Sequence, residues 1–357
     1  MKALNLYAVR DLRYDEVPVP ERRADEVLLR VKAVGICGSD LPRVFEKGTY
    51  HFPTIIGHEF AGEVAAAEDT ALVGRRAAVF PLVPCGVCSA CQTGHYAQCS
   101  QYDYYGSRCD GAMAEYIAVK QRNLVFLPDD VPYEAAAMGE PAAVALHAFR
   151  KARVGLGQTL VVFGIGPIGL IIAQWARAAG VKNIVLVARS EEKTAFARQQ
   201  GFMQAINSQQ TDVEAYVRGL TAGQGADACI EGTGMSEPLA MCLLCAKNFG
   251  VVVTMGNPAG DMVLPQQAYW KILRKELRVV GTWNSSFCSI ENDWQDTLAA
   301  MENKTIDVLP LITHRYALAE YQTAFALMHE KREFYYKVMF VSEYTGMLQW
   351  ESKIVLR

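Results

Sequence analysis

The first 35 residues of this 357-residue chain alternate apolar and polar positions, which is the pattern of half-buried β-strands. Val27–Ala33 is the clearest run, and it leads directly into a glycine-containing segment, Gly35–Asp40. Further short apolar runs at Gly62–Ala65 and Arg76–Phe80 are separated by glycine and charged turns. Because these short strands follow one another closely, we expect a small β-rich barrel whose loops carry the polar residues.

From Gly157 onward the pattern changes to buried strands that alternate with helices. Thr159–Phe163 is a buried strand, Leu170–Ala179 is an apolar helix, and Asn183–Ala188 is a second strand after the expected crossover. This alternation continues, and it favours a doubly wound parallel sheet with helices on both faces. The further strands are expected at residues 227–231, 251–255 and 277–281.

Beyond Trp283 the chain returns to mixed structure, with strands expected at 312–316 and 335–341. We expect this part to rejoin the β-rich region, which makes that domain discontinuous. The predicted domains are residues 1–150 with 285–341 for the β-rich domain and residues 151–284 for the doubly wound domain. Residues 342–357 form a C-terminal tail with no assigned role.

The composition excludes several classes of function. The chain is 51% hydrophobic and 20% charged, with a net charge of -3, as in an ordinary globular protein. No basic field would attract nucleic acid or an anionic membrane, and no run of about 18 apolar residues would span a bilayer. The N-terminal residues Met1–Asn5 lack the pattern of a signal peptide. We therefore expect a cytoplasmic protein that binds neither nucleic acid nor membrane.

Four of the ten cysteines are crowded into one short segment. Cys85, Cys88 and Cys91 follow at intervals of three, and Cys99 comes eight residues later. This spacing lets a small lobe surround a tetrahedral zinc ion with four thiolates and no open position. We predict a structural zinc site here, because random placement of cysteines rarely gives this density.

A second group of candidate metal ligands follows the first strand. Cys37, His58 and Glu59 offer a thiolate, an imidazole and a carboxylate, a mixed set that holds zinc and leaves a position open for substrate. Ser39 is placed to pass a proton between a zinc-bound alcohol and solvent. Taken alone, these residues are equally compatible with a buried free cysteine and two surface polar residues. His147 lies on an apolar helical run and is predicted to be a packed core histidine.

A glycine-rich turn follows the strand Thr159–Phe163. Gly164, Gly166 and Gly169 form a GxGxxG motif between this strand and an apolar helix. In that order the glycines allow a tight turn and close approach to a pyrophosphate at the helix N-terminus. The segment therefore predicts a dinucleotide cofactor.

Taken together, these motifs make the chain resemble a zinc-containing medium-chain dehydrogenase of the polyol dehydrogenase branch. The resemblance covers nearly all of residues 1–341 and rests on Gly35–Asp40, Gly57–Glu59, the four-cysteine lobe, Gly139–Pro141 and Gly164–Gly169. Within that branch, segments at 37–45, 105–111 and 271–281 are most similar to the galactitol-1-phosphate 5-dehydrogenases. The implied fold is α/β: a GroES-like β-rich catalytic domain plus a Rossmann domain, in a homodimer or homotetramer.

The resemblance also implies roles for individual residues. Cys37 and His58 match the ligands of the catalytic zinc, either Glu59 or Glu140 supplies the carboxylate, and Ser39 matches the proton relay. The expected chemistry is hydride transfer between a secondary alcohol of a polyol and NAD(P), with two zinc ions per chain. The residues expected to bind the cofactor are Gly164, Gly166, Pro167, Ile168, Gly169, Ala188, Arg189 and Ser190.

Two departures from the family pattern bear on specificity. Arg43 replaces the tyrosine typical of sorbitol-type members, and with Arg108 it predicts a substrate that carries a phosphate or another anion. The alternative is that these arginines pair with acids such as Glu46 and Asp110.

The second departure lies at the end of the second Rossmann strand, where the acidic residue of NAD-dependent enzymes is replaced by Ala188. Arg189 and Ser190 follow it, and they favour NADP over NAD. The alternative is that Arg189 points to solvent or stacks on the adenine and that NAD is still accepted, which the nearby Glu191 and Glu192 leave open.

Two other functions are considered. A threonine or simple alcohol dehydrogenase of the same superfamily shares the zinc motifs and differs in the loops at 42–53 and 104–111. A non-catalytic zinc-binding relative would have lost catalytic ligands, whereas all of the expected ones are present here.

Overall fold

The computed structural model describes residues 1–342, and the predicted tail beyond them lies outside the described residues. The chain forms two compact units. The first contains Met1–Ala77, Tyr104–Arg122 and the chain from Ile312 onward, and the second contains Ala78–Asp103 and Asn123–Leu311. The domains predicted above are defined by the pattern of elements along the chain, and their bounds stay a prediction.

The first unit is built around one long strand, β3 (Glu26–Ile36). It pairs antiparallel with β5 (Glu59–Ala66), with β9 (Tyr116–Lys120) and with β18 (Lys337–Val341). β17 (Ile312–Tyr316) continues the sheet parallel to β18, so the last strands of the chain lie beside one of the first. A second, smaller sheet joins β1 (Lys2–Ala8), β2 (Asp11–Glu16) and β4 (Thr54–Ile55). Helical segments here are α1 (Asp40–Pro42), η1 (Arg43–Lys47), η2 (Thr70–Leu72), η4 (Gln121–Asn123), η6 (Leu318–Glu320) and α11 (Tyr321–Glu330).

The second unit contains a six-stranded parallel sheet in the order β13-β12-β11-β14-β15-β16. This order runs outward in both directions from β11, which is the doubly wound topology expected from the alternating strands and helices. The strands are β11 (Thr159–Phe163), β12 (Asn183–Ala188), β13 (Ala205–Asn207), β14 (Ala226–Glu231), β15 (Ala246–Thr254) and β16 (Arg278–Gly281). The predicted strands Thr159–Phe163 and Asn183–Ala188 are confirmed at both ends.

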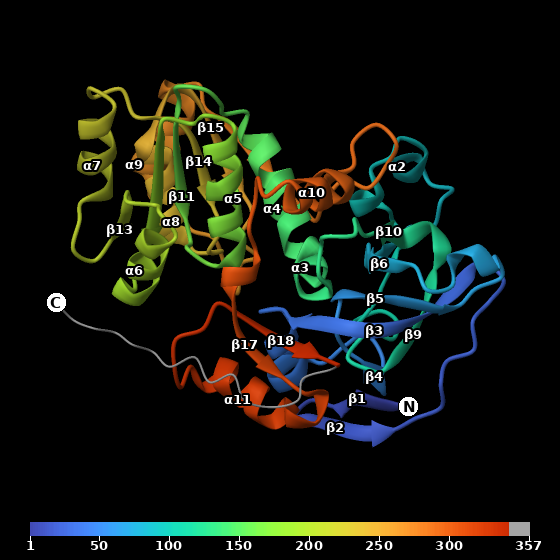
Figure 1. Cartoon of the computed structure of the whole chain (residues 1–357). Coiled ribbons are helices and arrows are strands. Elements are labelled where there is room, and N and C mark those ends of the chain that lie inside the picture. Colours follow the sequence, from blue (N-terminus) through green and yellow to red (C-terminus); the bar gives the residue numbers. More distant parts are fainter. Residues whose placement is uncertain (343–357) are drawn as a thin grey trace. The chain divides into compact units, whose positions relative to one another are not determined.

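Helices cover both faces of this parallel sheet (Figure 1). On one face, Val161, Phe163, Val185 and Val187 alternate with residues of the opposite face and pack against apolar residues of α7 and α8. The helices of the second unit are α2 (Ser89–Gln92), α3 (Tyr133–Ala137), α4 (Gly139–Ala152), α5 (Pro167–Ala178), α6 (Glu191–Gln199), α7 (Val213–Leu220), α8 (Ser236–Cys245), α9 (Gln266–Arg274) and α10 (Asp293–Glu302). Short segments η3 (Tyr96–Gln98) and η5 (Leu309–Leu311), and strands β6 (Arg76–Val79), β7 (Leu82–Val83), β8 (Asp103–Tyr104) and β10 (Leu124–Phe126), complete the described elements.

No helix within residues 1–342 is long and apolar enough to cross a membrane.

The predicted α/β class with a doubly wound sheet is confirmed.

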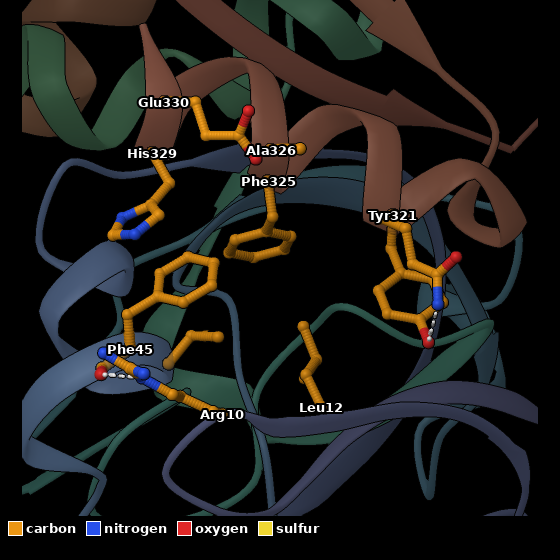
Figure 2. A pocket seen from close by; sticks show the side chains of 10 residues that line it. Arg10, Leu12, Phe45, Tyr321, Phe325, Ala326, His329 and Glu330 are labelled. Carbon is orange, nitrogen blue, oxygen red and sulfur yellow. Dashed lines mark hydrogen bonds between the residues drawn. The ribbon is translucent and has the colours of Figure 1, made fainter.

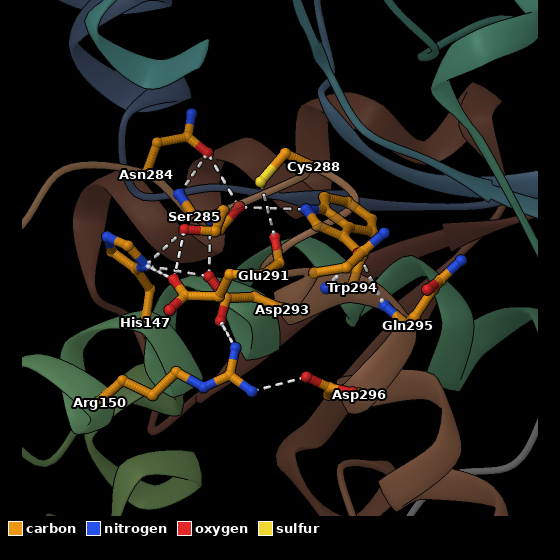
Figure 3. A network of polar contacts seen from close by, with 12 residues as sticks. His147, Arg150, Asn284, Ser285, Cys288, Glu291, Asp293, Trp294, Gln295 and Asp296 are labelled. Atoms are coloured by element: carbon orange, nitrogen blue, oxygen red, sulfur yellow. Dashed lines mark hydrogen bonds and ion pairs between the residues drawn. The ribbon is translucent and has the colours of Figure 1, made fainter. Parts of the chain in front are cut away.

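A buried polar network fastens the start of α10 to α4 (Figure 3). Asp293 is fully buried and accepts a hydrogen bond from the Ser286 amide at 2.6 Å. His147 contacts the same carboxylate at 3.0 Å, and Arg150 forms an ion pair with it. His147 is therefore a buried histidine held by hydrogen bonds, as predicted, and its side chain is used within this network.

We predict that Asp293→Ala lowers the free energy of unfolding by about 3 kcal/mol, because it leaves Arg150 and the Ser286 amide without their shared acceptor. Urea unfolding of the two proteins measures the difference. Asp296→Ala is the matched control: Asp296 pairs with the same Arg150 at 2.6 Å but is 54% exposed, so we expect a loss below about 1 kcal/mol. Equal losses for the two variants would contradict a special role for the buried carboxylate.

Candidate metal and cofactor sites

The pairing of β3 with β5 brings the first predicted ligand set together. In this antiparallel pair Gly35 lies opposite Glu59, so the chain leaving β3 at Cys37 meets the chain entering β5 at His58. Ligand atoms of Cys37, His58 and Glu59 all lie within 4.8 Å of one another. Residues from two separate segments of the sequence thus offer a thiol, an imidazole and a carboxylate to one point.

Glycines make room for this approach. A Cβ atom at Gly35 would lie 2.3 Å from Oε2 of Glu59, so only glycine leaves space for that carboxylate. Gly57 has a φ of +101°, which favours glycine, and the chain at Gly106 and Gly111 packs directly on its backbone. The segment 105–111 therefore supports the turn that presents His58.

Asp40 is a member of this site that sequence reasoning missed. Its side chain is fully buried, accepts the Cys37 amide at 3.0 Å and pairs with Arg43 at 2.8 Å. The Oδ1 atom lies 3.5 Å from Nδ1 of His58. Asp40 ends the motif that contains Cys37, and this was the available signal.

The electrostatics of the cluster attract positive charge. Burial acts to raise the pKa of Asp40, but the neighbouring His58 and Arg43 lower it to about 2. Burial acts to lower the pKa of His58, whereas the charges of Asp40 and Cys37 hold it well above its ordinary value. A metal cation would take the place of that proton, since metal ligands bind in their deprotonated form.

The state of the imidazole fits this interpretation. Nδ1 of His58 is buried and has no hydrogen-bond partner within residues 1–342, because 3.5 Å is too long for a good hydrogen bond to Asp40. The imidazole of His58 lies beside a thiol and two carboxylates, and this set of donors suits a metal ion.

Lys337 is the second residue that sequence reasoning missed. Its ammonium donates to both carboxylate oxygens of Glu59, at 2.8 and 2.5 Å, and to the Ile36 carbonyl at 3.3 Å. The pair is buried and joins residues 278 positions apart. Lys337 begins β18, and only the pairing of β18 with β3 places it here, so no local pattern could have found it.

Ser39 and Arg43 are connected to each other. Nη1 of Arg43 donates to Ser39 Oγ at 3.0 Å as well as to Asp40. Of the two alternatives for Arg43, an ion pair with a nearby acid is therefore present, and its partner is Asp40 and not Glu46. Both side chains are partly exposed beside Cys37.

Arg108 lies against an exposed tyrosine. Its guanidinium stacks at 4.2 Å over the ring of Tyr50, and Nη2 lies 3.4 Å from the tyrosine hydroxyl. Asp110, the other acid considered, accepts the Ile55 amide at 2.9 Å. Glu140 is the second residue of α4 and is buried in the second unit; its part in the ligand set stays a prediction.

The four-cysteine lobe is also assembled. The sulfur atoms of Cys85, Cys88, Cys91 and Cys99 lie within 4.8 Å of one another, with separations of 3.5 Å for Cys88–Cys91 and 3.9 Å for Cys85–Cys91. A tetrahedral zinc ion with bonds of about 2.3 Å separates its sulfur ligands by about 3.8 Å. Backbone amides of Cys91 and Ser100 lower the pKa of Cys88 to about 6, whereas burial raises the pKa of Cys91 to about 12. The lobe therefore fits a closed zinc site.

The glycine-rich turn has the geometry of a phosphate-binding turn. Gly164 has a φ of +106°, and a Cβ at Gly169 would lie 2.1 Å from the Gly164 carbonyl oxygen. Gly166 caps α5, and Pro167 is its first residue, with Ile168 next. After β12 ends at Ala188, Arg189 is exposed and Ser190 caps α6 by accepting the Lys193 amide at 3.4 Å.

Figure 2 shows a separate pocket of about 240 Å³ in the first unit. It lies between the β1–β2 hairpin, η1 and α11, where the ring of Phe45 stacks on His329 at 3.9 Å. Its lining includes none of the predicted site residues, so it is distinct from the ligand set.

A parallel Rossmann-type sheet with a glycine-rich turn in one unit, and a cysteine–histidine–glutamate group in the other, together define a dehydrogenase that uses a metal. Comparison with known proteins agrees. Residues 23–129 match the alcohol dehydrogenase GroES-like domain, and residues 167–303 match the zinc-binding dehydrogenase family.

Individual relatives cover most of the chain. Galactitol 1-phosphate 5-dehydrogenase of Escherichia coli (strain K12) is 36% identical over 85% of this chain and 89% of its own length. Sorbitol dehydrogenase of Bacillus subtilis (strain 168) is 31% identical over 91% of this chain and 92% of its own.

Two solved structures are similar throughout. The crystal structure of galactitol-1-phosphate dehydrogenase from Escherichia coli has a TM-score of 0.89 and 33% identity, and covers 96% of this chain and 100% of that one. A zinc-binding dehydrogenase from Sinorhizobium meliloti 1021, bound to NADP, has a TM-score of 0.87 and 28% identity, and covers 95% and 98%.

The chain belongs to the zinc-binding, medium-chain dehydrogenase family. Within it, the chain is an oxidoreductase of the polyol dehydrogenase branch, as the sequence motifs predicted.

We predict that Lys337→Met, measured by urea unfolding in zinc-free protein, lowers the free energy of unfolding by about 3 kcal/mol, because it leaves the buried Glu59 carboxylate unpaired. Adding Glu59→Gln should restore most of the loss. Lys2→Met is the control, since its pair with Glu16 is exposed and is expected to contribute below about 1 kcal/mol. If the double variant were no more stable than Lys337→Met, the ion pair would not be the cause.

Proposed function

We propose that the enzyme oxidises a secondary alcohol of a polyol phosphate with NADP, using zinc held by Cys37, His58 and one carboxylate. The observation that carries this proposal is the convergence of these ligand atoms within 4.8 Å, beside Ser39. When bound there, zinc would act as a Lewis acid and lower the pKa of the substrate hydroxyl.

Three side chains would assist the reaction at this site: Ser39, Arg43 and Asp40. Ser39 would relay the alcohol proton, accepting it on Oγ while its own hydroxyl proton passes to solvent, and the hydrogen bond from Arg43 holds that hydroxyl in place. Asp40 would orient the imidazole of His58, as carboxylates do beside metal-binding histidines. These roles explain why a buried carboxylate lies behind the ligand set.

Two carboxylates are candidates for the remaining ligand. Glu59 is near the other ligands, and Lys337 donates to both of its carboxylate oxygens. Glu140 is the second residue of α4 and is buried, and it would take the position while Glu59 is engaged by Lys337. We propose that the two exchange during turnover.

We predict two zinc ions per chain by elemental analysis, one at the ligand set and one at the four-cysteine lobe. Cys37→Ser should reduce turnover to below about 1% of wild type with little loss of stability, because an open site does not hold the fold together. Cys88→Ser should destabilise the lobe, since a structural zinc contributes folding free energy directly. One zinc or none in carefully prepared wild-type protein would contradict the assignment.

The substrate proposal rests on two arginines and on the names of similar proteins. Arg108 presents a guanidinium on an exposed tyrosine ring, and Arg43 is partly exposed beside Ser39. A planar guanidinium matches phosphate better than a neutral hydroxyl. One relative is a galactitol 1-phosphate 5-dehydrogenase and another a D-arabitol-phosphate dehydrogenase.

We predict that Arg108→Ala lowers kcat/KM for a phosphorylated polyol by about tenfold or more, the loss expected for a charge-assisted hydrogen bond, and leaves the neutral polyol within about twofold. Arg43→Ala should impair both substrates, because Arg43 also holds Ser39 and Asp40. Arg13→Ala, which removes an exposed arginine paired with Asp11, is the control. Equal weakening of both polyols by Arg108→Ala would end the proposal of an anion receptor.

The cofactor proposal rests on the end of β12. Ala188 lacks the carboxylate that binds the ribose of NAD and repels a 2′-phosphate, and Arg189 and Ser190 offer a cation and a hydroxyl. Similar structures are bound to NADP in one case and to NADH in another, so the fold accepts both cofactors.

We predict a higher kcat/KM with NADP than with NAD, and a reversal by about tenfold to a hundredfold in the double variant Ala188→Asp with Arg189→Ala, because one or two charged hydrogen bonds are exchanged. Initial rates with both cofactors measure this ratio. A wild-type preference for NAD that these changes leave untouched would refute it.

We further propose a homodimer or homotetramer. Strand β16 lies at the edge of the parallel sheet, and exposed apolar residues occur on it, shortly after it and on α9: Val279, Trp283, Tyr269 and Leu273. We also propose a cytoplasmic location, because Cys85, Cys88, Cys91 and Cys99 are grouped as metal ligands, and a reducing compartment favours thiolate ligation over disulfides.

A further inference from the structure

Glu191, the first residue of α6, carries a negative charge that would repel a phosphate bound at the end of β12. Glu191 follows Ser190, the residue that caps the helix, so its carboxylate begins at the same helix N-terminus. Such a carboxylate is favourable in an isolated helix, because it meets the positive end of the helix dipole. Near the 2′-phosphate of NADP, however, the same charge would repel the ligand.

Arg198 holds this carboxylate. Its Nη1 donates to Oε1 of Glu191 at 3.0 Å. The two residues are seven positions apart on one face of α6, about 10 Å along the helix axis. The ion pair therefore draws the Glu191 side chain away from the N-terminus and toward the body of the helix. The same hydrogen bond is the main reason that the pKa of Glu191 is lowered.

Arg198 is itself fixed by the strand next to β12. Its Nε and Nη2 donate to the Ala205 carbonyl at 3.1 and 2.8 Å. Ala205 begins β13, whose last residue, Asn207, lies opposite Ala188 in the parallel pair. The guanidinium is thus anchored to the edge of the sheet that ends at the proposed phosphate site, and it offers its remaining nitrogen to Glu191.

We infer that Arg198 is a positioning residue for cofactor choice, which keeps the charge of Glu191 away from the 2′-phosphate of NADP. The inference rests on the proposed preference for NADP. Arg189 and Ser190 would contact the phosphate, whereas Arg198 acts only through Glu191. Glu192 projects about 100° further around the helix, so its charge acts alike in every variant.

The test is a double-mutant cycle read by binding. Dissociation constants of NADPH and NADH are measured by nucleotide fluorescence for wild type, Arg198→Gln, Glu191→Gln and the double variant. Glutamine keeps an amide that can donate to the Ala205 carbonyl but carries no charge. We expect Arg198→Gln to weaken NADPH relative to NADH by about three- to tenfold, the repulsion of one carboxylate and a phosphate several ångströms apart. Adding Glu191→Gln should remove this loss.

Two features separate this effect from simple destabilisation. The loss should shrink as salt rises from 20 to 300 mM, since screening weakens charge repulsion. Arg218→Gln is the matched control: Arg218 pairs with Glu214 at 2.8 Å and donates to the Gly223 carbonyl, but on α7. It should leave the NADPH to NADH ratio unchanged.

The possible results separate the role inferred for Arg198 from the proposed preference for NADP. Tighter NADPH binding by wild type, with an unchanged ratio in Arg198→Gln or a loss that Glu191→Gln does not restore, overturns the inference alone. Tighter NADH binding by wild type overturns the NADP proposal and the inference together.

Discussion

The buried carboxylate of Asp40 is the interaction on which the candidate metal site depends. It accepts the Cys37 amide, pairs with Arg43 and faces His58, so one negative charge fixes the thiol, the imidazole and the arginine that holds Ser39. A charge in such a place is costly unless it is paired. Here its partners are the residues that the proposed chemistry uses. The interactions that stabilise the loop therefore also hold the site residues in position.

The same principle applies to Glu59. Lys337 neutralises it, and this ion pair connects β18 to the strand that begins at Glu59. A cation at the ligand set would compete with Lys337 for the carboxylate. The region around Cys37 is therefore suited to positive charge, whether it comes from a proton, an ammonium group or a metal ion.

Patterns in the sequence predicted the features of this protein that depend on residues within one short segment. The strands around Gly164, the turn itself and the four-cysteine lobe each depend on residues within a short segment, and the sequence identified them. Cys37, His58 and Glu59 could be found because their motifs are close in the sequence. Lys337 could not, since its place depends on a strand pairing that joins the two ends of the chain. The sequence suggested Glu46 as a partner of Arg43, whereas the structure pairs Arg43 with the buried Asp40. Both acids are close to Arg43 in the sequence, and that closeness does not tell which of them is buried.

The central claim is that Cys37, His58 and a carboxylate hold a zinc ion. Anomalous diffraction at the zinc edge, from crystals of the enzyme grown with zinc, tests it most directly. The account predicts one peak inside the four-cysteine lobe and a second about 2.3 Å from Cys37 Sγ and about 2.1 Å from a ring nitrogen of His58. A peak in the lobe alone, with Lys337 still bound to Glu59 and no density beside Cys37, would contradict it.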